Sequence, residues 1–292
     1  MDAREQATPE DLPPLELRVL RELGLTESSG PGRDPHISAA SGVVRRGDFV
    51  YVIGDDELGL GVFHISSADP GELRQALSGE LPTADSERAR EKPDLEGLTT
   101  LPPFEGAPYG GLFGLGSGSA PYRDRGFFWP LAPDGGLEGD SWEISLHPVY
   151  ELLRKDVADL NIEGASVMGE RLWLLHRANA GKGPNVIAEL ELERVMASLR
   201  GDRSIDPEEL AGLRGYELGE LDGVPLCFSD ASPLADQALV FTASAEDEDG
   251  KISGSVVGTI SLDGKVQRLR TIDRRWKVEG VYASIDTGVM DM

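Results

Sequence analysis

Cysteine is almost missing from this chain of 292 residues. The single one, Cys227, lies in the apolar run Val224-Pro225-Leu226-Cys227-Phe228. A lone cysteine in such a run is typical of a small buried side chain. Because no intrachain disulfide can form, the composition suits a reducing compartment.

Long hydrophobic runs are missing as well. No stretch approaches the roughly 18 consecutive apolar residues that a membrane span needs. The first residues, Met1-Asp2-Ala3-Arg4-Glu5, are acidic and are followed by no apolar segment of the kind a secretory signal contains. We therefore predict a soluble, cytoplasmic protein without a membrane partner.

Basic residues are scarce relative to acidic ones. The chain has 28 Lys and Arg residues against 52 Asp and Glu residues, a formal net charge of −24. A surface of this sign repels nucleic acid phosphates and anionic lipids, so we expect neither as a partner. The field instead favours a cationic ligand or a bound metal ion.

Several catalytic motifs are absent. The glycine-rich stretch Leu112–Ser119 lacks the Gly-x-Gly-x-x-Gly pattern and the helix that should follow it. Neither Ser117 nor Ser119 stands in a Gly-x-Ser-x-Gly elbow. The acidic run Glu246–Gly250 departs from a calcium loop and predicts a hairpin turn. No metal-ligand spacing links the four histidines, which are His36, His64, His147 and His176.

Glycine and proline, in contrast, are frequent, at 36 and 19 residues. Short runs of aromatic and β-branched residues alternate with polar turns, as in Phe49–Ile53 and Val256–Ile260, which predicts many short strands. Helical spacing is limited to residues 148–160 and 192–214. The pattern indicates an all-β protein with short helical insertions.

One short phrase recurs, consisting of an acidic residue or serine followed by glycine and an apolar run. Its four copies and a looser fifth are Ser41-Gly42-Val43-Val44, Glu96-Gly97-Leu98, Glu163-Gly164-Ala165, Ser229-Asp230-Ala231 and Glu279-Gly280-Val281. Each copy opens a strand–tip–strand unit, and such units at a period of about 50 to 70 residues are typical of propeller blades. We predict a single β-propeller domain over residues 15–292, after a flexible arm over residues 1–14. Five blades are expected, and a sixth is left open.

The last unit is incomplete, because only 12 residues follow Gly280. Leu15–Val19 alternates apolar and polar residues at period two, as a half-buried strand does. Either this strand completes the last blade and closes the ring, or the chain stops short of its natural end.

In a propeller, the first strand of each blade lines the central channel, so the copies of the phrase should converge. Glu96, Glu163 and Glu279 would then face one another, with Ser41 and Asp230 completing the circle. Because like charges disfavour ionisation, these carboxylates need a hard cation, a basic side chain or shared protons. Oxygen ligands without thiols favour Ca²⁺. The alternative is that the acid–glycine pairs only form turns between blades.

A resemblance accompanies this pattern. Five segments resemble an uncharacterised bacterial β-propeller family, and more distantly the esterase-like phytase and calcium-dependent phosphotriesterase or lactonase propellers: Ser41–Val44, Tyr51–Asp55, Lys92–Leu98, Gly116–Ser119 and Asn161–Gly164. The resemblance implies a central calcium held by Glu96, Glu163 and Glu279. Ser41 departs from the calcium-binding pattern of those hydrolases.

We therefore expect a carboxylate-lined channel that binds a small ligand or Ca²⁺, with a metal-dependent hydrolase of phosphoesters or lactones as its enzymatic version. In that version His176 or Asp55 activates water, while Glu96, Glu163 and Glu279 hold the metal. The remaining ligand-binding residues are Ser41, Ser117, Arg177, Asn179 and Asp230. The rival hypothesis is a non-catalytic scaffold that binds protein, and the sequence leaves open whether the protein is an enzyme.

Overall fold

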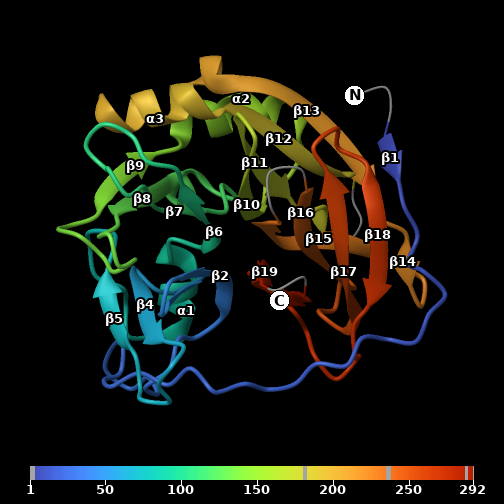
Figure 1. Cartoon of the computed structure of the whole chain (residues 1–292), viewed down its shortest axis with the longest axis horizontal. Coiled ribbons are helices and arrows are strands. Elements are labelled where there is room, and N and C mark those ends of the chain that lie inside the picture. Colours follow the sequence, from blue (N-terminus) through green and yellow to red (C-terminus); the bar gives the residue numbers. More distant parts are fainter. Residues whose placement is uncertain (1–3, 180–182, 235–237, 287–288, 292) are drawn as a thin grey trace.

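Four antiparallel sheets stand around a common axis, and each sheet is built from consecutive strands (Figure 1). The computed structural model of the chain describes residues 4–179, 183–234, 238–286 and 289–291. The first sheet, blade one, consists of β2 (Ala40–Arg46), β3 (Phe49–Gly54), β4 (Gly59–His64) and β5 (Glu72–Gln75). Blade two consists of β6 (Leu95–Leu101), β7 (Gly111–Gly116), β8 (Arg125–Pro130) and β9 (Trp142–Ser145).

Blades three and four repeat this order, and each gains one additional strand. Blade three consists of β10 (Ile162–Met168), β11 (Arg171–His176), β12 (Asn185–Glu191) and β13 (Leu210–Glu217), and β1 (Arg4–Gln6) pairs in parallel with its outer edge. Blade four consists of β15 (Val224–Pro233), β16 (Ala238–Glu246), β17 (Ile252–Ser261) and β18 (Val266–Thr271), preceded by the short β14 (Glu220–Leu221). The arm expected over residues 1–14 therefore contributes a strand.

The hydrophobic core lies between neighbouring blades. Tyr51 of blade one packs in the same cluster as Phe127 of blade two. Blade two meets blade three in a cluster that includes Phe128 and Leu172, and Trp173 and Phe241 belong to the cluster between blades three and four. Because the strands are covered on both faces, they are apolar in continuous runs rather than alternating.

The described part of the chain contains three α-helices: α1 (Asp85–Glu91), α2 (His147–Asp156) and α3 (Leu192–Arg200). None of the helices in the described part of the chain is long and apolar enough to cross a membrane. The helix predicted over residues 148–160 is confirmed as α2 up to Asp156, and residues 157–160 are not helical. The helix predicted over 192–214 is wrong beyond Arg200, because Asp206 starts only a single 3₁₀ turn before β13 begins at Leu210.

The prediction of five or six blades is wrong, since the described residues form four. The fifth unit contributes only an extended segment over residues 278–283, followed by the two-stranded hairpin β19 (Ser284–Asp286) and β20 (Val289–Asp291). The predicted strand Leu15–Val19 is also wrong. Only Leu15 forms a bridge, to Ile272, and the residues after it cross the edge of the molecule between blades four and one (Figure 1).

Side chains of blade four hold this extended segment, residues 278–283, in place of a strand partner. Asp230 Oδ2 accepts the Val281 N–H at 2.8 Å, and Ser232 Oγ accepts the Ala283 N–H at 3.0 Å. Ser255 Oγ accepts the Val278 N–H at 3.2 Å. The segment thus occupies the place of the inner strand of a fifth blade and closes the ring.

Candidate functional site

The recurring phrase falls at a β-bulge in all four blades. The pairing of each inner strand with its neighbour shifts by one residue at Ser41, Glu96, Glu163 and Ser229. A bulge bends its strand and re-aims the extra residue, which explains why an acidic side chain can leave the sheet there. In blade four Ser229 takes this place, and Asp230 takes the place of the glycine.

The five copies lie against one another in a ring. A Cβ atom built on Gly164 would be only 2.8 Å from Asp230 Cα, and one on Gly280 would be 2.7 Å from Ser41 O. A Cβ atom built on Gly97 would be 3.3 Å from the backbone carbonyl carbon of Gly164, and one on Gly42 would be 3.1 Å from Glu96 O. At Gly164 and Gly280 a Cβ would require the neighbouring backbone to move, so these glycines set how closely the inner strands pack.

A cavity of about 570 Å³ opens at one end of this ring. Its lining contains seven of the residues that the sequence predicted as site residues: Ser41, Asp55, Glu96, Glu163, Arg177, Asn179 and Glu279. The side chains of Asn161, Glu246, Asp247, Glu248 and Lys277 join them. The lining has seven acidic and two basic side chains, and an acidic cavity attracts cations.

Two basic side chains divide the acids on one side of the cavity. Arg177 lies 2.9 Å from Glu246 Oε2 and 3.7 Å from Glu163 Oε2. Lys277 lies 2.5 Å from Glu279 Oε1 and 3.2 Å from Glu246 Oε2. These pairs neutralise Glu246 and Glu279. For these two acids, basic side chains therefore provide the compensation that the sequence analysis required.

On the other side, Lys92 neutralises a second group of acids. Its ammonium pairs with Asp55 and lies 2.8 Å from Asp94 Oδ1. Asp94 is buried and also accepts hydrogen bonds from Ser117 and, at 2.9 Å, from Arg123. Burial raises the pKa of Asp55, and the bond from Lys92 partly offsets this.

Glu96 has no basic partner among the described residues. Burial raises the pKa of Glu96 well above its ordinary value, and the nearby carboxylates of Glu163, Asp94 and Asp55 raise it further. A hydrogen bond from the Ser41 hydroxyl acts in the opposite direction. Glu96 is therefore the acid of the ring whose charge is least compensated.

The charge of Glu163 is partly compensated, less than that of Glu279 and more than that of Glu96. Burial raises its pKa to about 7, and Glu279 adds to the rise, while Arg177 and the Asn161 side chain oppose it. Asn161 Nδ2 donates to Glu163 Oε1 at 2.6 Å. With a pKa near neutrality, Glu163 can exchange a proton with a ligand or solvent at physiological pH.

Three predicted residues lie outside the cavity lining. His176 is buried, its Nδ1 accepts the Asn161 N–H at 3.0 Å, and burial lowers the pKa of His176 to about 4, so the ring is neutral. Ser117 is buried, and its hydroxyl donates a hydrogen bond to Asp94 Oδ2. Asp230 is fully buried, its Oδ1 has no hydrogen-bond partner among the described residues, and burial raises its pKa well above the ordinary value.

Sequence reasoning missed three residues at equivalent positions. Asp94, Asn161 and Lys277 each stand two places before a glutamate of the ring, and each contacts the site. The repeated offset was a usable signal, whereas Lys92 stood only within a resemblance segment and Glu246 only within a predicted hairpin turn.

One carboxylate group in the ring has the spacing of metal ligands. Oxygen atoms of Asp55, Asp94 and Glu96 lie within 4.8 Å of one another. The three predicted ligands, Glu96, Glu163 and Glu279, all line the cavity. Among the described residues, however, Glu96 is the only one of the three that belongs to this closely spaced carboxylate group.

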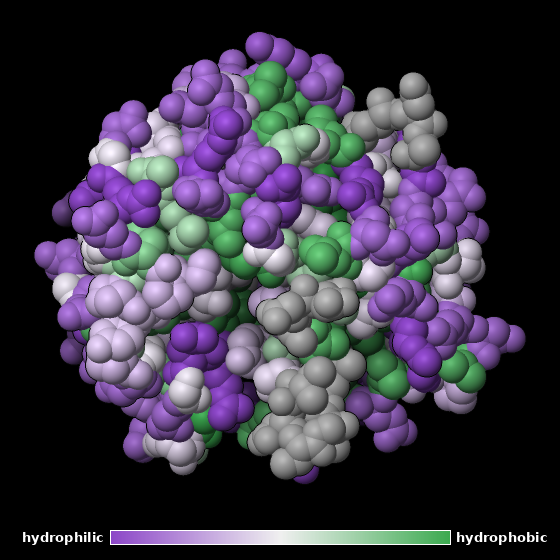
Figure 2. Space-filling model, turned by 45° about the horizontal axis from the view of Figure 1, so that its top comes forward, coloured by the Kyte–Doolittle hydropathy of each residue, from purple (hydrophilic) through white to green (hydrophobic). Residues whose placement is uncertain are grey.

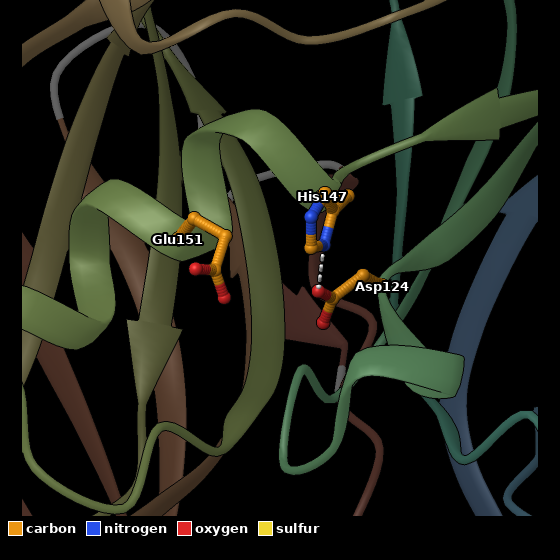
Figure 3. A group of neighbouring side chains, drawn as sticks. All are labelled: Asp124, His147 and Glu151. Carbon is orange, nitrogen blue, oxygen red and sulfur yellow. Dashed lines mark hydrogen bonds and ion pairs between the residues drawn. The ribbon is translucent and has the colours of Figure 1, made fainter.

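A second group lies away from the axis (Figure 3). His147 and Glu151 stand one turn apart on α2 and point towards Asp124. His147 Nδ1 lies 2.8 Å from Asp124 Oδ2, while Arg154 pairs with both Asp124 and Glu151. The guanidinium already satisfies the two carboxylates, so we interpret this group as a salt-bridge network that fixes α2 to blade two.

Four consecutive antiparallel sheets around one axis, with their inner strands converging on one cavity, define a fold of the β-propeller type. The chain belongs to the family of unknown function DUF6929, whose model matches residues 36–290. This confirms the predicted membership of an uncharacterised propeller family. The finer resemblance to phytase and lactonase propellers stays a prediction.

Among solved structures, three similar chains are enzymes. An α-L-arabinofuranosidase from Podospora anserina in complex with cellotriose is 10% identical, with a TM-score of 0.49, over 96% of this chain and 78% of that one. An exo-β-1,3-galactanase from Phanerochaete chrysosporium is 11% identical, with a TM-score of 0.45, over 89% and 57%. Glutaminyl cyclase from Myxococcus xanthus is 11% identical, with a TM-score of 0.38, over 93% and 100%.

No curated protein matches the chain. The assignment to the propeller type rests on the strand pairing described above.

Proposed function

We propose that the axial cavity binds a small cation, with Ca²⁺ as the ion that its chemistry suits best. The observation that carries the proposal is Glu96, an acid of the ring with no basic partner among the described residues and a pKa raised by burial and by three neighbouring carboxylates. A bound cation would supply the missing compensation. Carboxylate and amide oxygens are the ligands that Ca²⁺ prefers.

The spacing of the acids supports an ion near Glu96. Ca²⁺ binds oxygen at about 2.3 to 2.6 Å, so oxygens that share one ion lie within about 5 Å of one another. The oxygens of Asp55, Asp94 and Glu96 meet this condition. Lys92 now contacts two of them, and its flexible stem allows the ammonium to withdraw as an ion enters.

Thermal melting tests the proposal. A ligand that binds only the native state stabilises it by about 2.7 kcal/mol at a hundredfold excess over Kd, which is a rise of about 5 °C in a domain of this size. We expect Ca²⁺ to raise the melting temperature of the native chain and EDTA to reverse the rise. Glu96→Gln should abolish the shift, and Glu105→Gln, on an exposed loop, should retain it. Equal shifts in both variants would refute the site.

Removing Lys92 provides an opposite test. Lys92→Met leaves Asp55 without its ion pair and removes one of the two from Asp94, so without Ca²⁺ the variant should melt lower than the native chain. With Ca²⁺ the rise should be larger than in the native chain, because the ion no longer competes with an ammonium. A smaller rise would mean that Lys92 contributes to the ligand site instead of blocking it.

One observation favours an enzymatic version of the same site. Glu163, with a pKa of about 7 beside Glu96, is suited to accept a proton from an attacking water, as is Asp55. Ca²⁺ would supply positive charge for a substrate oxygen. A panel of phosphoesters and lactones tests this version. Hydrolysis that Glu163→Gln lowers about a hundredfold would support it, and activity equal in both proteins would contradict it.

A further inference from the structure

An apolar groove of about 340 Å³ lies between blades one and four. Val43 and Val50 of blade one form one wall, and Val257 and Ile272 of blade four form the other. The extended segment, residues 278–283, runs along its floor. The groove thus lies where the outer strands of a fifth blade would stand, at the edge that the N-terminal segment crosses in Figure 1.

Only some of the backbone N–H groups along the floor of the groove donate hydrogen bonds. In the other blades the inner strand pairs with a second strand along its length, as β10 does with β11. Residues 278–283 pair with no strand in the described ranges, and their bonds go to side chains of blade four. Within the same ranges, the N–H groups of Gly280 and Tyr282 have no hydrogen-bond partner. Such a segment is a template for another strand.

The rim of the groove is apolar and exposed. Leu17 and Leu20 of the N-terminal segment line it with 40% and 68% of their surface exposed, and Ile65 after β4 is 37% exposed. The molecule is strongly acidic, yet three large aliphatic side chains are exposed together at this edge. Exposed apolar patches of this kind mark interaction sites.

We propose that this groove docks an extended, apolar peptide strand of a partner protein, which takes the place of the second strand of the fifth blade. The proposal does not depend on ligand binding in the axial cavity. Unpaired backbone groups on the floor select a strand, because a helix satisfies its own N–H groups internally. The walls are the faces of two sheets, so both sides of the strand would be covered and its sequence should be apolar without alternation.

Arg45 adds one element of specificity. It is exposed and lines the groove next to Val43. A partner strand with an acidic residue at one end would pair with this guanidinium. The second strand of blade one with its turn, Phe49–Asp56, has this composition, since the apolar run Phe-Val-Tyr-Val-Ile-Gly precedes two aspartates.

Fluorescence polarisation with a labelled peptide of the Phe49–Asp56 sequence tests the proposal on the whole chain. A matched peptide carries N-methyl groups on alternate residues, which retain the side chains but prevent strand pairing. We expect saturable binding of the first peptide and at least about tenfold weaker binding of the second. Equal binding of both peptides, or of neither, would overturn the proposal.

Substitutions on the rim locate the binding surface. Leu20→Asp and Ile65→Asp alter exposed side chains, so both variants should fold, and each should weaken peptide binding at least about tenfold. Leu262→Asp, at another apolar position that is 45% exposed, should leave binding unchanged. If light scattering finds a dimer that Leu20→Asp dissociates, a second copy covers the groove and the proposal fails.

Discussion

The phrase residues of the ring differ in how their charge is compensated. Glu279 pairs with Lys277, and Glu163 shares Arg177 with Glu246. Glu96 has no lysine or arginine partner among the described residues, and Ser41 carries no charge. The ring is therefore asymmetric: Lys92 pairs with Asp55 and Asp94, while Glu96 beside them keeps no basic partner among the described residues.

The pKa of Glu163 leads to a pH-dependent prediction. Between its ordinary value of 4.5 and its folded value of about 7, the native state binds more protons than the unfolded state, so stability falls as pH rises. Glu163→Gln removes this effect. Relative to the native chain, we expect the variant to gain about 2 kcal/mol more at pH of about 8 than at pH of about 5.5.

Urea unfolding at both pH values measures this difference, with Glu105→Gln as a control for the loss of one surface charge. An effect of Glu163→Gln that is independent of pH would show that Glu163 is ionised throughout. In that case the raised pKa would be wrong.

The sequence predicted that the acids converge but not how each is neutralised. Convergence follows from a repeated unit, because equivalent positions in blades meet at the axis. Compensation depends on single side chains without a repeated pattern, such as Lys92. Asp230 shows the same limit: its place in the phrase suggested the ring, and the bulge at Ser229 instead turned it into an anchor for residues 278–283.

At the level of elements, the bulge and the glycine act together. The bulge directs the side chain of Glu163 away from the sheet, and Gly164 lets blade three approach the backbone of blade four. Because a Cβ on Gly164 would lie 2.8 Å from Asp230 Cα, relief requires movement of a strand. Overpacking of this kind costs about 1 to 3 kcal/mol.

We therefore expect Gly164→Ala to lower the free energy of unfolding by about 2 kcal/mol in urea. Gly212→Ala on β13 is the matched control. A Cβ there meets nothing within 4 Å, so the expected change is within about 1 kcal/mol and in the stabilising direction. Equal losses in the two variants would mean that glycine is needed for strand conformation and not for close approach.

Strands were predicted better than the helix after β12. Apolar runs bounded by turns identified β3 and β17, because burial on both faces leaves an uninterrupted apolar signal. The segment over 192–214 combined a true helix with a strong helix start at Asp206. The capping box forms there, but β13 pairs with β12 immediately afterwards, and tertiary pairing overrides the local preference.

At the level of the whole molecule, ring closure depends on residues 278–283. The sequence could not show this, because the anchors Asp230, Ser232 and Ser255 lie in blade four, more than twenty residues away along the chain. A blade count from repeats assumed that each phrase brings a full set of strands. The fifth phrase brings only the inner part.

Loss of these anchors should loosen the segment locally. In Asp230→Ala and Ser232→Ala, we expect the amides of Val281 and Ala283 to exchange hydrogen at least about tenfold faster. Exchange in the core of blades one to three should stay unchanged. Thr259→Ala on β17 is a control without this effect, and unchanged protection of Val281 in Asp230→Ala would contradict the assigned anchor.

The central claim, that the axial cavity is a cation site, is tested most directly by titrating Ca²⁺ into the native chain by calorimetry near pH 7. The account predicts saturable binding of one ion, with proton release because the raised pKa values of Glu96 and Glu163 fall when a cation binds. The apparent enthalpy should therefore change with the ionisation enthalpy of the buffer, and Glu96→Gln should not bind. An absence of binding by the native chain, or equal binding by Glu96→Gln, would contradict the claim.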